Sequence, residues 1–273
     1  MAATSAFALY GFSESYRPQV NRIEIPLKRL PEAFDGFTIA QLSDFHYEVF
    51  SAVPIRKAVG LVNSLRPDLI VLTGDFVTVG AFESRSHSRV HAWTAAVPCA
   101  EILSRLEAPV GRFAILGNHD ADSNPRMVRD VIQSHGVPLL KNQSVAIERG
   151  PARIWLAGVD DALRGTPDLG ATIEKIPPQE VIILLAHEPD FADEAALTPV
   201  DLQLSGHSHG GQIWIPGIGA PWLPPLGRIY PRGLYQIENL TLYTNVGIGT
   251  IHVPIRINCI PEVALITLRT ARA

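Results

Sequence analysis

The sequence is poor in cysteine, in charge and in long apolar runs, and each shortage excludes a class of protein. Its 273 residues include only two cysteines, Cys99 and Cys259, too few for a disulfide-stabilised scaffold. No run of about 18 or more apolar residues occurs, so we expect no membrane-spanning helix. Charged residues make up 18% and the net charge is −4, which disfavours a protein that binds nucleic acid through its phosphates.

The amino-terminal stretch also lacks the basic flank that a signal peptide carries. We interpret residues 1–20 as an N-terminal extension, such as the remnant of an anchor, within a single domain that spans residues 1–273. We expect a cytoplasmic protein, or one peripheral to the inner membrane of a bacterium. The oligomeric state stays open at this stage.

Hydrophobic residues make up 47% of the chain, which is enough for a large core. Several apolar runs of strand length do not alternate with polar residues, as is typical of strands covered on both faces. Stretches with helical spacing lie between the early runs, and two segments, 77–96 and 210–233, look irregular. The pattern predicts an α/β fold, a β-sandwich with helices outside. The seven runs are residues 37–42, 68–74, 113–118, 153–159, 181–187, 201–206 and 240–246.

Polar side chains follow five of these runs, at the point where each predicted strand ends. In α/β sheets the carboxyl ends of strands converge on the ligand site, so we expect these side chains to form one cluster. Asp44 and His46 are two residues apart, as are His207 and His209; in an extended chain such pairs point the same way. The candidates are Asp44, His46, Asp75, Asn118, His119, Asp120, His187, His207 and His209.

Carboxylate, imidazole and amide oxygen, without thiolate, suit Mn, Fe or Zn. Seven such ligands exceed what one ion needs. With an aspartate bridging, they fit two ions roughly 3.5–4 Å apart, as in two-metal hydrolytic sites. One histidine at a strand end is usually a structural residue, but five of the nine histidines stand at such ends. This placement argues against a structural protein with core histidines.

The motifs SDFHY, TGDF, GNHD, AHEPD and GHSHGG, in this order, resemble those of the calcineurin-like metallophosphoesterases. The resemblance runs from about Phe37 to the C-terminus, and the late stretch PIRINCIPEVALITL is similar to a bacterial subgroup of membrane-associated phosphodiesterases and phosphatases. The resemblance implies a four-layer αββα fold and a hydrolase that uses two metal ions to cleave phosphate esters. Among these activities it favours a phosphodiesterase. A phosphomonoesterase, a nucleotide-sugar or lipid pyrophosphatase and a non-catalytic metal-binding scaffold are the alternatives.

The family pattern also implies a role for each residue. The ligands fall into two sets that share Asp75 as the bridge: Asp44, His46, Asp75 and His209 for one ion, and Asp75, Asn118, His187 and His207 for the other. A hydroxide bridging the two ions is the implied nucleophile. His119 stands beside the leaving group, and we expect Asp120 to orient it. Where the family often has an acidic or amide residue, Thr78 stands in this sequence.

Further residues are candidates for substrate contact. Asn118 and Arg256 are predicted to bind the substrate phosphate, with an ion pair on a strand as the alternative for Arg256. The irregular segment 77–96 is predicted to act as a lid that brings His87 or His91 to the pocket mouth, with a solvated surface loop as the alternative. We interpret His135 and His252 as structural.

The segment 211–228 follows His209 and contains many apolar residues but no acidic one. We predict that it contacts a lipid surface or holds an acyl chain, because tryptophan suits a membrane interface and nearby arginines suit anionic headgroups. The alternative is that the segment folds inward and covers the sheet, which suits the isoleucines better than the tryptophans.

Overall fold

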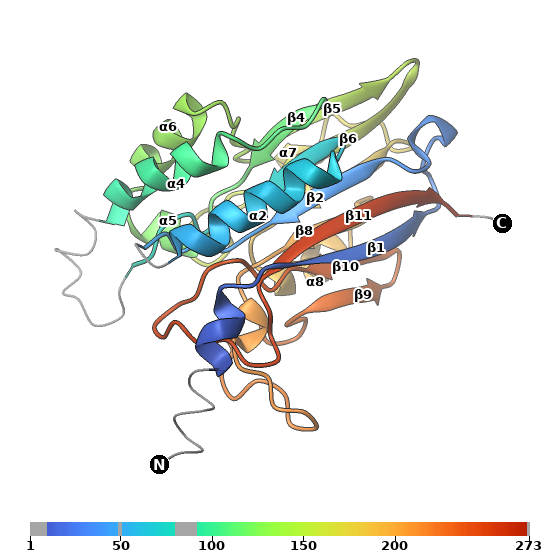
Figure 1. Ribbon diagram of the computed structural model, residues 1–273. Coiled ribbons are helices and arrows are strands. Elements are labelled where there is room, and N and C mark those ends of the chain that lie inside the picture. Colours follow the sequence, from blue (N-terminus) through green and yellow to red (C-terminus); the bar gives the residue numbers. More distant parts are fainter. Residues whose placement is uncertain (1–9, 49–50, 80–91, 272–273) are drawn as a thin grey trace, which may run out of the picture.

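The computed structural model describes residues 10–48, 51–79 and 92–271, and within them two mixed β-sheets pack face to face with helices outside (Figure 1). Their strand orders are β1-β11-β2-β3-β4 and β5-β6-β7-β8-β10-β9. The first sheet contains β1 (Gln19–Leu27), β2 (Thr38–Leu42), β3 (Leu69–Leu72), β4 (Gly111–Ala114) and β11 (Glu262–Thr270). The second contains β5 (Gln143–Arg149), β6 (Ala152–Gly158), β7 (Val181–Leu185), β8 (Leu202–Ser205), β9 (Gly233–Ile237) and β10 (Leu240–Thr244).

The helices cover the two outer faces. Figure 1 shows α2, α4 and α6 side by side over the first sheet. Besides a short helix at residues 10–15, the α-helices are α2 (Ala52–Leu65), α4 (Ala96–Leu103), α5 (Asn118–Asp122), α6 (Pro125–Ser134), α7 (Leu169–Ile173) and α8 (Ala192–Ala195). The 3-10 turns are η1 (Glu32–Phe34), η2 (Trp93–Ala95), η3 (Pro189–Phe191) and η4 (His209–Gly211). No helix in the described ranges is long and apolar enough to cross a membrane.

Three layers of buried apolar side chains hold these elements together. The middle layer lies between the sheets and includes Ile39 and Val71 from the first and Ile183 and Leu204 from the second. A second layer joins the first sheet to α2, α4 and α6, and a third joins the other sheet to α7 and α8. These layers confirm the predicted α/β sandwich with its four-layer order.

Local sequence explains the elements that position the site. Strands β3 and β7 are buried along their whole length, which is why their sequences do not alternate. Helix α6 begins at Pro125, and the side chain of Asn124 before it accepts a hydrogen bond from the Met127 N–H. Strands β2, β3 and β4 pair in parallel, as do β6, β7, β8 and β10. Their carboxyl ends therefore lie at a common edge within each sheet.

Candidate metal centre

The loops that follow β2, β3, β4, β7 and β8 meet at one end of the sandwich, and most of their polar side chains are buried there. The backbone N–H of His207 donates to both carboxylate oxygens of Asp44, at 3.0 and 3.1 Å. That of His119 donates to Asp75 Oδ1 at 2.9 Å. The first of these contacts joins a loop of one sheet to a loop of the other, and the second joins two loops of the first sheet. The structure thus brings together the seven side chains predicted as ligands: Asp44, His46, Asp75, Asn118, His187, His207 and His209.

The backbone at five of these positions is left-handed. The φ angles are 53° at Asp44, 42° at His46, 56° at Asp75, 69° at His207 and 52° at His209. Strand β2 ends at Leu42, so the reason we gave for the convergence of Asp44 and His46 was wrong. The pair is turned inward by left-handed residues and not by the pleat of an extended strand. Such a conformation costs about 1–2 kcal/mol per residue that is not glycine.

Two glycines allow backbone to pack against the cluster. A Cβ atom at Gly206 would overlap the side chains of Ser43 and Asp44, and one at Gly117 would overlap those of Asp75 and His187. Any larger residue at these two positions would displace a candidate ligand. The glycines in GNHD and GHSHGG are therefore part of the site's geometry.

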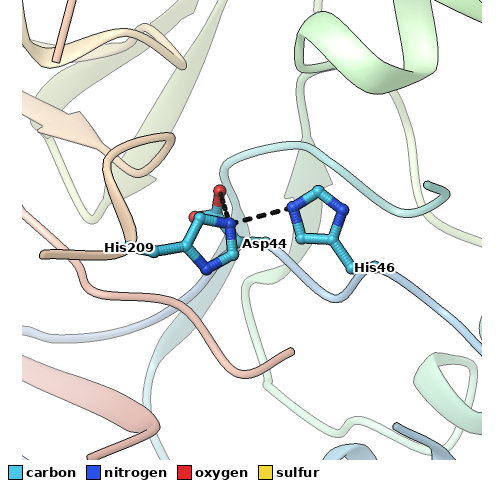
Figure 2. A group of neighbouring side chains, drawn as sticks. All are labelled: Asp44, His46 and His209. Atoms are coloured by element: carbon cyan, nitrogen blue, oxygen red, sulfur yellow. Dashed lines mark hydrogen bonds and ion pairs between the residues drawn. The ribbon is translucent and has the colours of Figure 1, made fainter. Parts of the chain in front are cut away.

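The candidate ligands form two groups. In the first, His209 Nε2 lies 2.9 Å from His46 Nε2 and 3.4 Å from Asp44 Oδ1 (Figure 2). In the second, the carboxylate of Asp75 and the rings of His187 and His207 approach one another, and His207 Nδ1 lies 2.8 Å from the side-chain oxygen of Asn118.

Asp75 connects these groups. Its Oδ2 lies 3.4 Å from His46 Nε2, in the first group, and 3.2 Å from His187 Nε2, in the second. One carboxylate oxygen thus faces ligand atoms of both groups, as a bridging ligand would.

Hydrogen bonds on the far side of the His187 and His207 rings leave the other ring nitrogen facing the cluster. His187 Nδ1 lies 2.6 Å from the Thr73 carbonyl and donates to it, while its buried Nε2 has no hydrogen-bond partner in the described chain. His207 Nε2 donates to the Pro225 carbonyl at 2.8 Å, so its Nδ1 and the Asn118 oxygen face each other as two acceptors. Paired acceptors and an unpartnered buried nitrogen are what a cation requires, and the residues present fit a metal.

Electrostatics favour a cation at the same place. Burial lowers the pKa of His46 to about 3 and that of His209 well below its usual range, so both rings are neutral, as metal ligands must be. Burial also raises the pKa of Asp44 to about 7. At His187 burial is outweighed by the Asp75 and Asp44 carboxylates, which raise its pKa well above the usual range. The two carboxylates therefore favour positive charge between them.

His119 lies beside the cluster but is oriented differently from our expectation. The backbone N–H of Val79 donates to His119 Nδ1 at 3.0 Å, so a neutral ring carries its hydrogen on Nε2. Asp120 does not orient it: its carboxylate accepts from the backbone N–H groups of Phe76, Val77 and Gly117. The prediction of a His119–Asp120 pair was wrong because Asp120 caps the turn that starts α5.

Thr78 takes part in the site although its residue type departs from the family pattern. Its hydroxyl lies 3.3 Å from His46 Nδ1, on the side of the ring away from the cluster. A hydrogen on Nδ1 that bonds this hydroxyl leaves Nε2 free for a metal.

Arg256 does not reach the substrate side of the site. Its side chain is fully buried behind His209, and its guanidinium donates to the Gly249 carbonyl, at 2.6 and 3.0 Å, and to the Cys259 carbonyl at 3.0 Å. It also lies 3.3 Å from His209 Nδ1. The predicted phosphate contact is thus replaced by a brace: Gly249 in turn donates its N–H to the Asp44 carbonyl, so Arg256 links two loops that carry candidate ligands.

A cavity of about 840 Å³ opens over the cluster. Asp75, Asn118, His119, His207 and His209 line its floor. Its wall includes His252, which we had interpreted as structural but which is exposed and has a φ of 63°. No motif marks this residue in the sequence. His87 and His91, predicted near the mouth, lie outside the described residues.

Comparison with known proteins identifies the family. Residues 37–211, more than half of the chain, match the family described as calcineurin-like phosphoesterase. The chain belongs to this family. It is a phosphoesterase, from a family that uses divalent metals, and the predicted resemblance is confirmed.

Three relatives cover most of the chain. The metallophosphoesterase YkuE of Bacillus subtilis, named as uncharacterized, is 34% identical over 98% of this chain and 92% of its own length. The phosphodiesterase YaeI of Escherichia coli is 31% identical over 85% of this chain and 82% of its own. A transmembrane protein with a metallophosphoesterase domain from Danio rerio is 31% identical over 98% of this chain, which spans only 61% of that protein.

The role of Arg256 as a brace can be tested by Arg256→Lys. We expect a loss of about 3 kcal/mol in the free energy of unfolding, because lysine cannot serve both carbonyls and a buried carbonyl left without a donor costs about 1–3 kcal/mol. Urea unfolding measures the change. The control is Arg153→Lys, at a partly exposed pair with Glu180, where less than about 1 kcal/mol is expected. Equal unfolding midpoints for Arg256→Lys and wild type would refute the brace.

Proposed function

We propose that this chain hydrolyses phosphodiesters with the aid of two divalent ions. The observation that carries the proposal is the position of Asp75 Oδ2 between His46 Nε2 and His187 Nε2, which suits a carboxylate shared by two ions. The first ion would be held by Asp44, His46, Asp75 and His209, and the second by Asp75, Asn118, His187 and His207. Oxygen and imidazole ligands without thiolate suit Mn, Fe or Zn.

Such ions would supply activated water for attack on phosphorus and would neutralise charge on the phosphoryl oxygens. The chain's own residues then position the substrate. Asn118 lines the cavity floor, and with its oxygen toward His207 its amide nitrogen is left to donate to a phosphoryl oxygen. His119 presents Nε2–H to the same cavity, because Val79 occupies Nδ1. The burial that lowers the pKa of His119 keeps the ring neutral. His119 thus stabilises the leaving oxygen by a hydrogen bond.

A diester is favoured over the alternatives by two observations. The relative YaeI is named a phosphodiesterase, and the cavity extends well beyond the volume that a phosphate group fills. A phosphomonoesterase and a nucleotide-sugar or lipid pyrophosphatase use the same kind of cluster and are the other outcomes of a substrate panel. A non-catalytic scaffold would hydrolyse no member of that panel.

The first prediction concerns metal content and reaction class. Metal-reconstituted protein is expected to hold two ions per chain by elemental analysis and to hydrolyse a bis-ester faster than a mono-ester or a nucleoside diphosphate sugar. Asp75→Asn is expected to lose most of the bound metal and at least about 100-fold in rate, because the bridge is gone.

Asp130→Asn, on the exposed face of α6, is the control and should bind metal and turn over as wild type does. An active wild type with one ion per chain would contradict the two-metal proposal. Faster turnover of the mono-ester would contradict the diester assignment alone.

A second prediction concerns His119→Ala. The variant is expected to keep its metal content and lose about 10²-fold or more in rate on alkyl esters, with a smaller loss on activated aryl esters. The reason is that a poor leaving group needs the Nε2–H most. His135→Ala, at the end of α6, is the matched control. An equal loss on both ester types would rule out a role at the leaving oxygen.

We further propose that segment 211–228 contacts a membrane surface. Ile215, Ile218, Trp222 and Leu226 are 39%, 78%, 58% and 37% exposed, an apolar surface without an acidic residue. Trp222 is exposed as expected, but the Trp214 ring is covered by the Arg232 guanidinium, 3.7 Å from its centroid. Ile215 and Ile218, which we expected to be less exposed than the tryptophans, provide much of the exposed surface. In a protein peripheral to a membrane, this segment would be the part that contacts the bilayer surface.

Ile218→Ser tests the membrane contact. We expect roughly tenfold weaker co-sedimentation with anionic phosphatidylglycerol vesicles, because burying an isoleucine contributes about 1.5–3 kcal/mol. The control is Leu197→Ser, which removes an 82% exposed leucine near the end of α8. Equal binding by Ile218→Ser and wild type, or no binding by wild type, would remove the proposal.

A further inference from the structure

The wall of the cavity is apolar where it leaves the metal-ligand cluster. Ile213, Trp222, Pro224 and Pro225 come from the segment after η4, and Ile251 and Val253 from the loop after β10. These side chains face the same cavity whose floor is formed by the candidate ligands. A phosphate placed on the cluster therefore has apolar surface beside it.

Most polar side chains along this wall already form hydrogen bonds or ion pairs within the protein. Gln212 donates through Nε2 to the carbonyls of Ile251 and Val253, and its Oε1 accepts from the Ile251 N–H. Arg164 pairs with Asp122 at 3.0 Å. Ser208 donates to the Pro231 carbonyl and accepts from the Gly210 N–H.

Of the polar groups that line the cavity away from its floor, the His252 imidazole and the Trp222 indole N–H form no hydrogen bond in the described chain. A site that selects a sugar or a base requires free donors and acceptors for its hydroxyl and ring atoms. The described wall offers such a substituent few free polar groups: the His252 imidazole, the Trp222 indole N–H and the guanidinium nitrogens of Arg164 that do not face Asp122.

We propose that the phosphoester substrate carries an alkyl or acyl chain, which lies along the wall formed by Ile213, Trp222, Ile251 and Val253. The inference rests on the proposed function and adds the class of the organic group. Hydrophobic burial supplies the binding free energy, and the phosphate on the cluster fixes the position of the ester bond.

Two features of the wall suit it to bind an alkyl or acyl chain. Gln212 ties the 251–253 loop to the segment after η4 by three hydrogen bonds, and Ile213 pairs with Ile257, so both halves are held together before substrate arrives. Trp222 and Val253 are 58% and 47% exposed, so the wall continues from the cavity to the outer surface. A chain too long for the cavity therefore extends outward along Trp222.

A homologous series of 4-nitrophenyl alkyl phosphates, from methyl to octyl and below micelle-forming concentrations, tests the inference. We expect kcat/KM to rise about two- to fourfold for each added methylene until the wall is covered. Trp222→Ser is expected to lower the octyl-to-methyl ratio by about tenfold, and Leu197→Ser to leave it unchanged. Hydrolysis of every ester with no dependence on chain length would overturn the inference and leave the proposed function intact.

A binding measurement separates the two proposals. Calorimetric titration with methyl-, butyl- and octylphosphonic acid needs no turnover, and affinity is expected to increase with chain length in wild type and less so in Trp222→Ser. Chain-dependent binding without hydrolysis would refute the proposed function but support the apolar wall. Chain-independent binding would refute the wall.

Turnover of the same octyl ester, either dissolved or bound to phosphatidylcholine vesicles, distinguishes a membrane lipid from a free amphiphile as the source of the chain. A membrane source predicts that Ile218→Ser lowers turnover of the vesicle-bound ester but not of the soluble octyl ester. Equal turnover of both by this variant assigns a free amphiphile as the substrate.

Discussion

The site depends on one constraint, a left-handed backbone conformation at five residues that are not glycine. Each of these conformations costs about 1–2 kcal/mol, and their sum approaches the whole free energy of unfolding of an ordinary domain, about 5–15 kcal/mol. The apolar layers on both sides of each sheet must therefore hold the strand ends in place. A cation that binds only the folded chain would add to this stability by mass action, so metal binding and folding are thermodynamically linked.

The atoms behind the ligands are as specific as the ligands themselves. Backbone carbonyls of Thr73 and Pro225 and the hydroxyl of Thr78 fix which ring nitrogen faces the cluster. Pro225 contributes to both the ligand and the cavity: its carbonyl accepts the hydrogen bond that orients His207, and its ring lines the cavity wall. The position of a ligand and the shape of the substrate wall are therefore coupled through one residue.

Much of the fold and of the cluster followed from the sequence, because buried central strands and the polar residues after them leave a clear pattern. Strands β5 and β9 were not predicted: they lie at the edges of their sheet, and their residues are largely exposed or half-buried, so their sequences resemble loops. Strand β1 was missed as well, since it too lies at an edge and contains Pro26. Strand β11 was also missed, although it is central in its sheet and mostly buried. The pairing of β1 with β11, more than 200 residues away, is a long-range contact that no local pattern encodes.

The secondary contacts of the site were predicted less well than the ligands. The brace by Arg256 and the true partner of His119 depend on loops that approach only in the folded chain. A guanidinium that contacts carbonyls and one that contacts phosphate look the same in a sequence. The motif GNHD likewise placed His119 and Asp120 side by side, although the turn of α5 directs their side chains to different partners.

Strand β11 lies between β1 and β2, parallel to the one and antiparallel to the other. The strands of the first sheet thus cannot pair in the order in which the ribosome synthesises them. Strand β11, which separates β1 from β2, emerges after all the other described strands. Until then β1 and β2 have no common partner, and the edge of β2 that β11 will occupy stays unpaired. Until β11 is synthesised, this nascent chain presents an open sheet edge to other strands, and the first sheet is completed only after that strand has emerged.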